Sequence, residues 1–390
     1  MQVFVLNSGS SSVKCAVFQH EKRIFSGFIE RIGFNDARVQ YKDFVGNIQE
    51  DYIESVLNHH QALLVIANTL KKLQFKIEAI GHRIVHGGEK FSKPVIVNEE
   101  VKKYIRDCIV LAPLHNPYNL LGIEICEQYF PGITNVAVFD TAFHSTIPKE
   151  YAIYPLPYEY YVKYKIRKYG FHGTSHQYLM LKASELLNKS PENLKIITCH
   201  LGNGASITAI KNGKSVDTSM GFTPTAGLMM GTRCGDVDPS AIIYLQQVEN
   251  ISARDMEVVI TKKSGLLGVS GISADMREIV FNIDKSTRAK LAFKMYCYYV
   301  KKYIASYIGI LNGVDCIVFS AGVGENSPRV REEILKNMEN LGIIIDKEKN
   351  FSTVGKDGII SADESQVKVM VLRTDEELMI AKITAQLAKV

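Results

Sequence analysis

The sequence predicts an α/β protein built from two similar halves, and three observations support this expectation. Strands and helices alternate along most of the 390 residues. Each half begins with a strand-rich stretch before the alternation starts. Each half also places a loop of small polar residues after its first strand, at 7–12 and again at 202–204. These features favour a duplicated domain, with chance similarity of two Gly- and Ser-rich loops as the alternative.

The first half is predicted to open with a meander of three short strands, because three apolar runs are separated by turn residues. Apolar residues at helical spacing then predict a long helix over 51–73. The remaining elements follow from the same patterns: strands over 79–85 and 135–139, and helices over 99–111 and 118–129. The meander strands themselves are expected at 2–6, 13–19 and 23–29.

The second half repeats this order of elements. Strands are expected at 194–200, 206–211 and 214–218, with Asn212-Gly213 as a strong hairpin turn between the last two. Helical spacing predicts helices at 240–248, 286–312, 328–341 and 376–388, and apolar runs predict strands at 315–319 and 367–372. Pro155 and Pro157, among many tyrosines, mark the expected crossing between the halves.

Composition excludes several classes of function. The 46 basic and 41 acidic side chains give a net charge of only +5, too weak and too scattered to indicate a nucleic-acid partner. No apolar run reaches the roughly 18 residues of a membrane span, and residues 1–6 lack the basic start of a signal peptide. The seven cysteines have no CxxC spacing, so we expect free thiols in a reducing cytoplasm.

Three loops at strand ends have the composition of phosphate-binding loops. The first is 7–12 with Lys14 just beyond it, the second is 200–204, and the third is 319–326, between a strand and a helix. Small residues let backbone N–H groups approach a phosphate. A plain hairpin turn explains the first loop equally well. Neither Gly-x-Gly loop completes a dinucleotide fingerprint, because Ile207 and Ser327 replace its last glycine.

Several polar residues at strand ends are candidates for chemistry. Asp140 follows a buried strand, where it could cap a helix or orient a magnesium ion. Arg83 and Arg233 lie beside glycines, a setting that suits an anion clamp better than a surface salt bridge. His115 and His172 are similarly placed, but the histidines lack metal-ligand spacing, and a structural role is the default for each.

Nine segments of the chain resemble signature segments of the acetate kinase family. The resemblance implies the actin-like ATPase fold: two duplicated ribonuclease H-like domains with a central interdomain cleft. It implies a first domain of 1–148 plus 378–390, and a second of 149–377 with the nucleotide loops and the dimer interface. The matching segments run in order along the chain: 7–14, 82–88, 138–144, 169–176, 200–206, 231–236, 273–277, 322–326 and 373–377.

The family reaction implied is reversible, magnesium-dependent transfer of a phosphoryl group from ATP to acetate, giving acetyl phosphate and ADP within acetyl-CoA metabolism. Asn7 and Glu376 correspond to the residues associated with Mg²⁺, with Mn²⁺ as a possible substitute. Arg83, Asp140, His172 and Arg233 correspond to the catalytic residues. Arg83, Val85, Leu114, Phe171 and Pro224 correspond to the acetate pocket. The ATP and ADP contacts correspond to Lys14, His200, Leu201, Gly202, Asn203, Gly204, Asp275, Met276, Arg277, Gly322, Val323, Gly324, Glu325 and Asn326.

Two residues depart from the family pattern. Cys234 stands where serine is expected, and Asp375 stands where asparagine is more usual. Asp375 adds a charge beside Glu376 and puts the geometry of the metal site in question. The acceptor is already a carboxylate with a pKa near ~4, so we expect Asp140 to act through magnesium or water rather than as a general base.

Other functions remain open on the sequence. A propionate or butyrate kinase differs by one or two methylenes, which an apolar pocket separates by only ~1–3 kcal/mol per methylene. An actin-like ATP-binding switch needs no acceptor pocket, and a sugar kinase needs Asp140 as a base. The resemblance also implies a cytoplasmic homodimer. The tyrosine-rich stretch 151–164 either contributes to its interface or forms a buried domain junction.

Overall fold

The computed structural model describes residues 1–389, which form two compact units. Unit 1 comprises Met1–Ser145 together with the described residues from Asp375 onward, and unit 2 comprises Thr146–Thr374. The sequence analysis assigned 375–377 to the second domain. In the structure these residues belong to unit 1, because Asp375 caps the terminal helix α15 (Glu376–Leu387), which packs on the unit 1 sheet.

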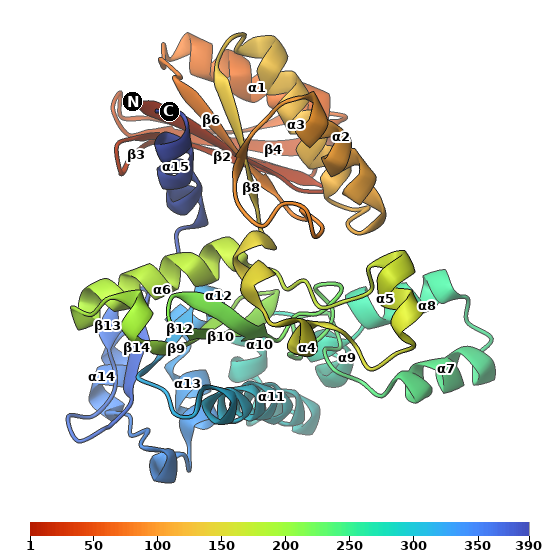
Figure 1. The fold of residues 1–390 in the computed structure, drawn as a ribbon, viewed down its shortest axis with the longest axis vertical. Helices are drawn as coiled ribbons and strands as arrows, with labels where there is room; N and C mark the ends of the chain where they lie inside the picture. The colour runs from red at the N-terminus through yellow and green to blue at the C-terminus, as the bar shows by residue number, and fades with distance from the viewer. Residues whose placement is uncertain (390) are drawn as a thin grey trace. The chain divides into compact units, whose positions relative to one another are not determined.

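Unit 1 is an eight-stranded sheet with helices on both faces (Figure 1). The spatial order of its strands is β5-β4-β3-β2-β1-β6-β8-β7. The strands are β1 (Gln2–Ser8), β2 (Ser12–Gln19), β3 (Lys22–Glu30), β4 (Phe34–Asp43), β5 (Ile48–Val56), β6 (Ala79–Ile84), β7 (Val95–Ile96) and β8 (Thr134–Phe139). The other helices are α1 (His59–Lys72), α2 (Glu99–Asp107) and α3 (Asn116–Tyr129), and short 3-10 turns follow at Cys108–Val110 and Ala142–Thr146.

Alternating side chains on β1 divide the core of unit 1 between the two faces of the sheet. Phe4 and Leu6 pack toward α1 and α3, whereas Val3 and Val5 pack toward α15. Gly81 on β6 lets α15 approach closely, because a Cβ there would lie 2.3 Å from Thr384 Oγ1. The N- and C-terminal segments of the chain therefore share one core.

The helix predicted over 51–73 is wrong in its first third. Residues up to Val56 form β5, and α1 begins at His59, where Asn58 caps it by accepting a hydrogen bond from the Gln61 N–H. The β5 strand pairs with β4 at the edge of the sheet, and nearly all its side chains are exposed. Because polar residues occur on both faces of β5, its sequence shows no alternation of apolar and polar residues. Backbone hydrogen bonding to β4 therefore makes this segment a strand.

Unit 2 contains a six-stranded sheet in the order β11-β10-β9-β12-β14-β13. Figure 1 shows α6 and α11 on opposite sides of this sheet. The strands are β9 (Lys195–Leu201), β10 (Ala205–Lys211), β11 (Lys214–Thr218), β12 (Cys316–Ser320), β13 (Gly358–Ile359) and β14 (Lys368–Val371). The helices are α4 (Lys149–Ala152), α5 (Tyr158–Tyr164), α6 (Gly173–Leu187), α7 (Pro239–Val248), α8 (Ala253–Lys262), α9 (Gly265–Ser270), α10 (Met276–Phe281), α11 (Thr287–Leu311), α12 (Ala321–Asn326), α13 (Pro328–Leu335) and α14 (Lys347–Ser352), with 3-10 turns at Pro191–Asn193 and Glu339–Leu341.

The two sheets share one topology. In unit 1, β1, β2 and β3 pair antiparallel, and β6 and then β8 continue from β1 in parallel. In unit 2, β9, β10 and β11 pair antiparallel, and β12 and then β14 continue from β9 in parallel. The α/β class and the duplication expected from the two loops are therefore confirmed.

Two smaller expectations are settled by exposure and length. The stretch 151–164 is not a buried junction, because Tyr151, Tyr158 and Tyr164 are each about half exposed and α5 buries none of its side chains. The predicted helix 328–341 is shorter than expected, since α13 ends at Leu335 and a 3-10 turn follows. Among residues 1–389, every helix is too short or too polar to cross a bilayer.

Candidate active site

Three candidate residues of unit 1 meet because their strands run parallel. Leu6 of β1 lies opposite His82 of β6, and Ile84 of β6 lies opposite Phe139 of β8. The carboxyl ends of the three strands therefore lie at one edge of the sheet, where α/β proteins bind ligands. Asn7, Arg83 and Asp140 come together at this edge.

Arg83 is the centre of this cluster. Its Nη2 donates to Asp140 Oδ2 at 3.0 Å, and its Nη1 donates to Asn7 Oδ1 at 3.4 Å. Burial works against the charge of the guanidinium, but Asp140 and Glu376 outweigh it and raise the pKa of Arg83. The Nε atom has no hydrogen-bond partner, although it is shielded from solvent. Arg83 thus remains a cation with donor capacity left for an anionic ligand.

Glu376 opens helix α15 on the same unit. Removal from water raises the pKa of its carboxyl to about 7, and Asp140 and Glu377 add to the shift while Arg83 opposes it. Its Oε1 is buried and has no hydrogen-bond partner. A carboxylate in this state gains from a nearby cation.

The charge of Asp375 is compensated within unit 1. Its side chain accepts a hydrogen bond from Leu378 N–H and so caps α15. Arg23 of β3 donates to both of its oxygens, at 2.9 and 3.1 Å, and also pairs with Glu377. The negative charge that departs from the family pattern is therefore held by Arg23.

The oxygen atoms of unit 1 fit a magnesium ion. Asn7 supplies an amide oxygen and Glu376 a buried carboxylate oxygen without a partner, and oxygen donors are the ligands that Mg²⁺ prefers. Within residues 1–389, no group of three or more His, Cys, Asp or Glu side chains is placed to hold a metal ion alone. Mg²⁺ commonly keeps waters and binds together with substrate phosphates, so two protein oxygens are enough to take part in its site.

In unit 2, His172 and Arg233 converge at Gly204. A Cβ built on Gly204 would lie 3.2 Å from Arg233 Nη1 and 3.6 Å from His172 Nε2. His172 adopts a left-handed backbone (φ 57°) where α6 begins, and its ring stacks on His200 at 4.3 Å. A non-glycine residue in this conformation is a strained feature typical of functional sites.

Arg233 is an uncompensated cation. Its Nη1 donates to the carbonyl of Pro224 at 3.1 Å, and no carboxylate within residues 1–389 forms an ion pair with it. Burial accordingly lowers the pKa of Arg233, in contrast to Arg83. A partly buried guanidinium without an anion is a ready partner for phosphate.

A pocket of about 1090 Å³ opens beside these residues in unit 2. Glycine loops from β9 and β12 border it, as the carboxyl ends of parallel strands do in nucleotide sites. Eight residues predicted to contact ATP line it, namely Gly202, Asn203, Asp275, Met276, Arg277, Gly322, Val323 and Asn326. Ser273, from the quoted segment 273–277, also lines it, as do Leu266, Val280, Arg329 and Phe351, which the sequence analysis did not single out.

The other predicted nucleotide contacts do not line this pocket. Leu201 and Gly324 are buried, and Glu325 binds the backbone N–H groups of Ala321 and Thr374, so these residues shape the loops. His200 bonds Ser175 at 2.8 Å. Lys14 belongs to unit 1, where it pairs with Asn7 across β1 and β2.

The four apolar candidates for the acetate pocket are divided between the units. Val85 is buried and Leu114 is 57% exposed in unit 1, while Phe171 is buried and Pro224 is half-buried in unit 2. Pro224 lies beside Arg233 through the bond to its carbonyl. Their assignment to a methyl pocket stays a prediction.

Two supporting features were missed by the sequence analysis. The buried Arg331 donates to the carbonyls of Gly324 and Glu325 at 2.8 and 3.2 Å, and so anchors the carboxyl-terminal end of the short helix α12. Ser206 and His176 bond one another and connect to His172. Ser206 and His176 occur in segments quoted for the family resemblance, but their contacts depend on the fold.

Cys234 presents a small change beside Arg233. Its thiol donates to the Gly235 carbonyl at 3.1 Å, and burial raises its pKa. The other six cysteines are buried, and all seven are free. A raised pKa keeps Cys234 in the less reactive thiol form.

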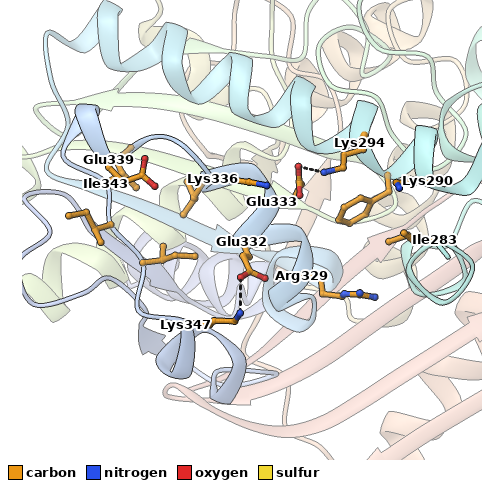
Figure 2. A pocket seen from close by; sticks show the side chains of 14 residues that line it. Ile283, Lys290, Lys294, Arg329, Glu332, Glu333, Lys336, Glu339, Ile343 and Lys347 are labelled. Carbon is orange, nitrogen blue, oxygen red and sulfur yellow. Dashed lines mark hydrogen bonds and ion pairs between the residues drawn. The ribbon is translucent and has the colours of Figure 1, made fainter.

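A second pocket of unit 2, about 600 Å³, has a different character (Figure 2). Its rim carries Lys294 paired with Glu333 at 2.5 Å and Lys347 near Glu332 at 3.7 Å. Of its lining residues, Arg329 also borders the first pocket. None of the residues predicted to bind or react lines this second pocket.

Comparisons with known proteins identify the family of this chain. The model of the acetokinase family matches residues 2–382. An acetate kinase of Caldicellulosiruptor saccharolyticus is 52% identical, and the match covers 99% of both chains. The crystal structure of Porphyromonas gingivalis acetate kinase superposes with a TM-score of 0.94 at 44% identity, and a propionate kinase from Francisella tularensis gives 0.93 at 41%; each covers 99% of both chains. The chain therefore belongs to the acetokinase family.

Proposed function

We propose that this chain is an acetate kinase that reversibly transfers the terminal phosphoryl group of ATP to acetate, giving acetyl phosphate and ADP. The observation that carries the proposal is Arg233, a cation without a carboxylate partner, which converges with His172 at Gly204 beside the 1090 Å³ pocket. Family membership over residues 2–382 supports the same reaction. In this proposal the pocket binds the nucleotide.

The chemistry requires positioning and positive charge more than proton transfer. A carboxylate oxygen of acetate attacks the terminal phosphorus, and the bond from that phosphorus to the bridging oxygen of ADP breaks. No proton is released, because the acceptor is already ionised at neutral pH. Arg233 and His172 donate toward the oxygens of the transferring group, where charge is spread in a loose transition state.

Arg83 and Asp140 act as a unit in this proposal. The guanidinium holds the acetate carboxylate or the transferring phosphoryl group, and the 3.0 Å hydrogen bond that its Nη2 donates to Asp140 fixes its orientation. Asn7 and Glu376 would hold Mg²⁺ or Mn²⁺. When bound, this ion neutralises charge on the phosphates. Asp140 is not needed as a base, which separates this reaction from that of a sugar kinase.

We assign acetate rather than propionate as the substrate because the chain is 52% and 44% identical to two acetate kinases. Its 41% identity to the Francisella propionate kinase supports the alternative. One methylene changes the discrimination by only ~1–3 kcal/mol, so overlapping activity on propionate is expected. An actin-like switch transfers no phosphoryl group to an acceptor, so it does not require the uncompensated charge of Arg233 beside the proposed nucleotide pocket.

A hydroxylamine trap tests the proposal directly. Acyl phosphate formed from ATP, Mg²⁺ and acetate, propionate or butyrate is converted to a coloured hydroxamate and quantified. The strongest signal with acetate supports the proposal, and the strongest signal with a longer acid assigns the chain to that acid. Nucleotide hydrolysis without any hydroxamate refutes acyl phosphate synthesis and favours the switch.

We also propose a cytoplasmic homodimer formed through unit 2. Helix α7 buries none of its side chains, although it carries Ile243, Tyr244 and Leu245, which are all exposed. The exposed tyrosines of α5 add to the apolar surface of this unit. Seven free cysteines suit a reducing compartment.

A further inference from the structure

A chain of four side chains runs through unit 2 and ends at His172. Thr198 Oγ1 lies 2.7 Å from His176 Nδ1, His176 Nε2 lies 2.8 Å from Ser206 Oγ, and Ser206 Oγ lies 2.8 Å from His172 Nδ1. Thr198, His176 and Ser206 are fully buried. The first, third and fourth members come from β9, β10 and the start of α6, so the fold aligns residues that are distant in sequence.

The number of protons available to these four side chains determines which of them donates in each hydrogen bond. Each hydroxyl has a single proton to donate. Within residues 1–389, the side-chain oxygen of Thr198 bonds only His176, and that of Ser206 bonds only the two histidines. If Thr198 donates to His176, then His176 donates from Nε2 to Ser206, and Ser206 donates to His172 Nδ1. The two hydroxyl protons and the His176 proton then each have an acceptor.

The other arrangements each leave a buried proton without an acceptor. If His172 donated from Nδ1 and every hydrogen bond ran in the opposite direction, the Thr198 hydroxyl would accept a hydrogen bond from His176 and its own proton would have no acceptor. If both histidines donated to Ser206, the Ser206 proton would be stranded. Because buried donors without acceptors carry a desolvation penalty, the first direction is favoured.

We propose that this relay holds neutral His172 with its proton on Nε2, and that Ser206 and His176 are positioning residues for it. The Nε2 edge faces Gly204, where it lies near the Nη1 of Arg233. A proton on Nε2 makes both groups donors toward the same space, so an anion there receives two hydrogen bonds. The inference rests on the proposed function only in naming that anion as the transferring phosphoryl group.

The ligand-free, full-length protein tests the tautomer without any assay of activity. ¹⁵N-histidine-labelled protein at pH 8 gives imidazole ¹⁵N spectra, and His172→Gln identifies the His172 signals by their loss. We expect Nδ1 of His172 at the downfield position of an unprotonated nitrogen and Nε2 at that of a protonated one. A proton on Nδ1, an even mixture, or an imidazolium at this pH overturns the proposal.

Variants then test the relay itself. Ser206→Ala and Thr198→Val remove its hydroxyls and are expected to shift His172 toward a tautomer mixture. They should lower kcat in the hydroxamate assay about tenfold, the effect of weakening one hydrogen bond in the transition state, with KM values within about twofold. Thr208→Val is the matched control, because Thr208 is equally buried on β10 but bonds Thr218 instead.

The outcomes separate the two proposals. If Ser206→Ala or Thr198→Val folds and the tautomer of His172 is unchanged, the relay is overturned. If neither variant folds, the wild-type spectrum still tests the tautomer assignment. Equal loss of kcat in Thr208→Val also overturns it, since packing would then explain the effect. If wild-type protein forms no hydroxamate but shows the Nε2–H tautomer, the proposed function fails and the tautomer assignment stands.

Discussion

At the scale of single residues, the two arginines of the proposed site differ in their electrostatic surroundings. Arg83 has two carboxylates near it, and they raise its pKa. Arg233 has none, and burial lowers its pKa. Carboxylates of the protein therefore compensate the charge of Arg83, whereas the charge of Arg233 is available to pair with an anionic ligand. In the proposed reaction, Arg83 therefore holds the anionic group in an orientation that Asp140 fixes, and Arg233 supplies a charge that no carboxylate of the protein compensates.

Arg83→Ala is expected to lower turnover in the hydroxamate assay by about 10²–10³, the range found when one charge-stabilising donor is removed. The control is Arg106→Ala on α2, where an exposed arginine pairs with Glu124. Because the loss of Arg83 removes the buried ion pair with Asp140, Arg83→Lys keeps the charge and separates instability from loss of the fork geometry. Near wild-type turnover in Arg83→Ala would remove Arg83 from the site.

The sequence predicted which residues belong to the candidate site better than it predicted the hydrogen bonds between their side chains. Arg83 and Asp140 were found because they lie at or just after the ends of strands, and Asn7 was found through the family resemblance. The contacts of Ser206 with His172 and His176 could not be found in this way, since they depend on how α6 packs on β9 and β10. Hydrogen bonds between side chains from separate elements leave no periodic pattern.

At the scale of elements, the start of α15 shows how a charge is accommodated. Asp375 caps the helix and is held by Arg23, so its two functions can be separated by substitution. Asp375→Ala should lower the free energy of unfolding by about 1–2 kcal/mol through the lost cap. Asp375→Asn keeps a capping oxygen and should cost about half as much or less.

Urea unfolding of both Asp375 variants checks this expectation, with Glu377→Gln as the control that weakens the Arg23 pair but keeps the cap. Equal costs for Asp375→Ala and Asp375→Asn would show that the ion pair, rather than the cap, is what matters. The partly exposed ion pair itself is expected to contribute less than ~1 kcal/mol.

Elements were predictable where burial imposes a period. In β4, Ala37, Val39 and Tyr41 are buried at every second position, a signal that was available and overlooked. In β5 almost every side chain is exposed, so its sequence says little about its structure. The false helical start over 51–56 is the result, because the polar edge strand directly precedes the true helix.

At the scale of the whole molecule, the duplicated topology explains why the candidate residues occur in corresponding loops. The loops after β1 and β9 occupy the same position in the two sheets, yet they carry different chemistry. The first presents Asn7 beside Arg83, and the second presents glycines beside the 1090 Å³ pocket that we propose to bind the nucleotide. In the proposed function, one fold thus supplies the cation and the metal-binding oxygens from unit 1 and the phosphate-binding pocket from unit 2.

The proposed homodimer gives a prediction about mass. Ile243→Asp and Tyr244→Asp place charges on α7, where both side chains are more than half exposed. We expect sedimentation equilibrium to report a dimer for the wild type and a monomer for the double variant, with unchanged circular dichroism. Leu186→Asp on α6, also about half exposed, is the matched control. A wild-type monomer, or a double variant that stays dimeric, would contradict an interface through α7.

Two buried histidines of unit 1 make stability dependent on pH. His82, which donates from Nε2 to Asn135 Oδ1 at 2.7 Å, and His86 both have a pKa lowered to about 4, mainly by burial. Unfolded histidine titrates near ~6.5, so the unfolded chain binds more protons between these values. The contribution of these two histidines to the free energy of unfolding is therefore fully present above pH ~6.5, and it is lost as the pH falls toward about 4.

Each histidine should contribute roughly 3 kcal/mol over this range, since one pKa unit corresponds to about 1.4 kcal/mol. Urea unfolding at pH 7.5 and pH 5.0 measures the slope. His82→Gln is expected to reduce it even if the variant is less stable at both values, because its share of the proton uptake disappears. His60→Gln, an exposed position on α1, is the control. An unchanged slope in His82→Gln would mean that other groups dominate acid unfolding, and that the depressed pKa of His82 does not govern the stability of the protein.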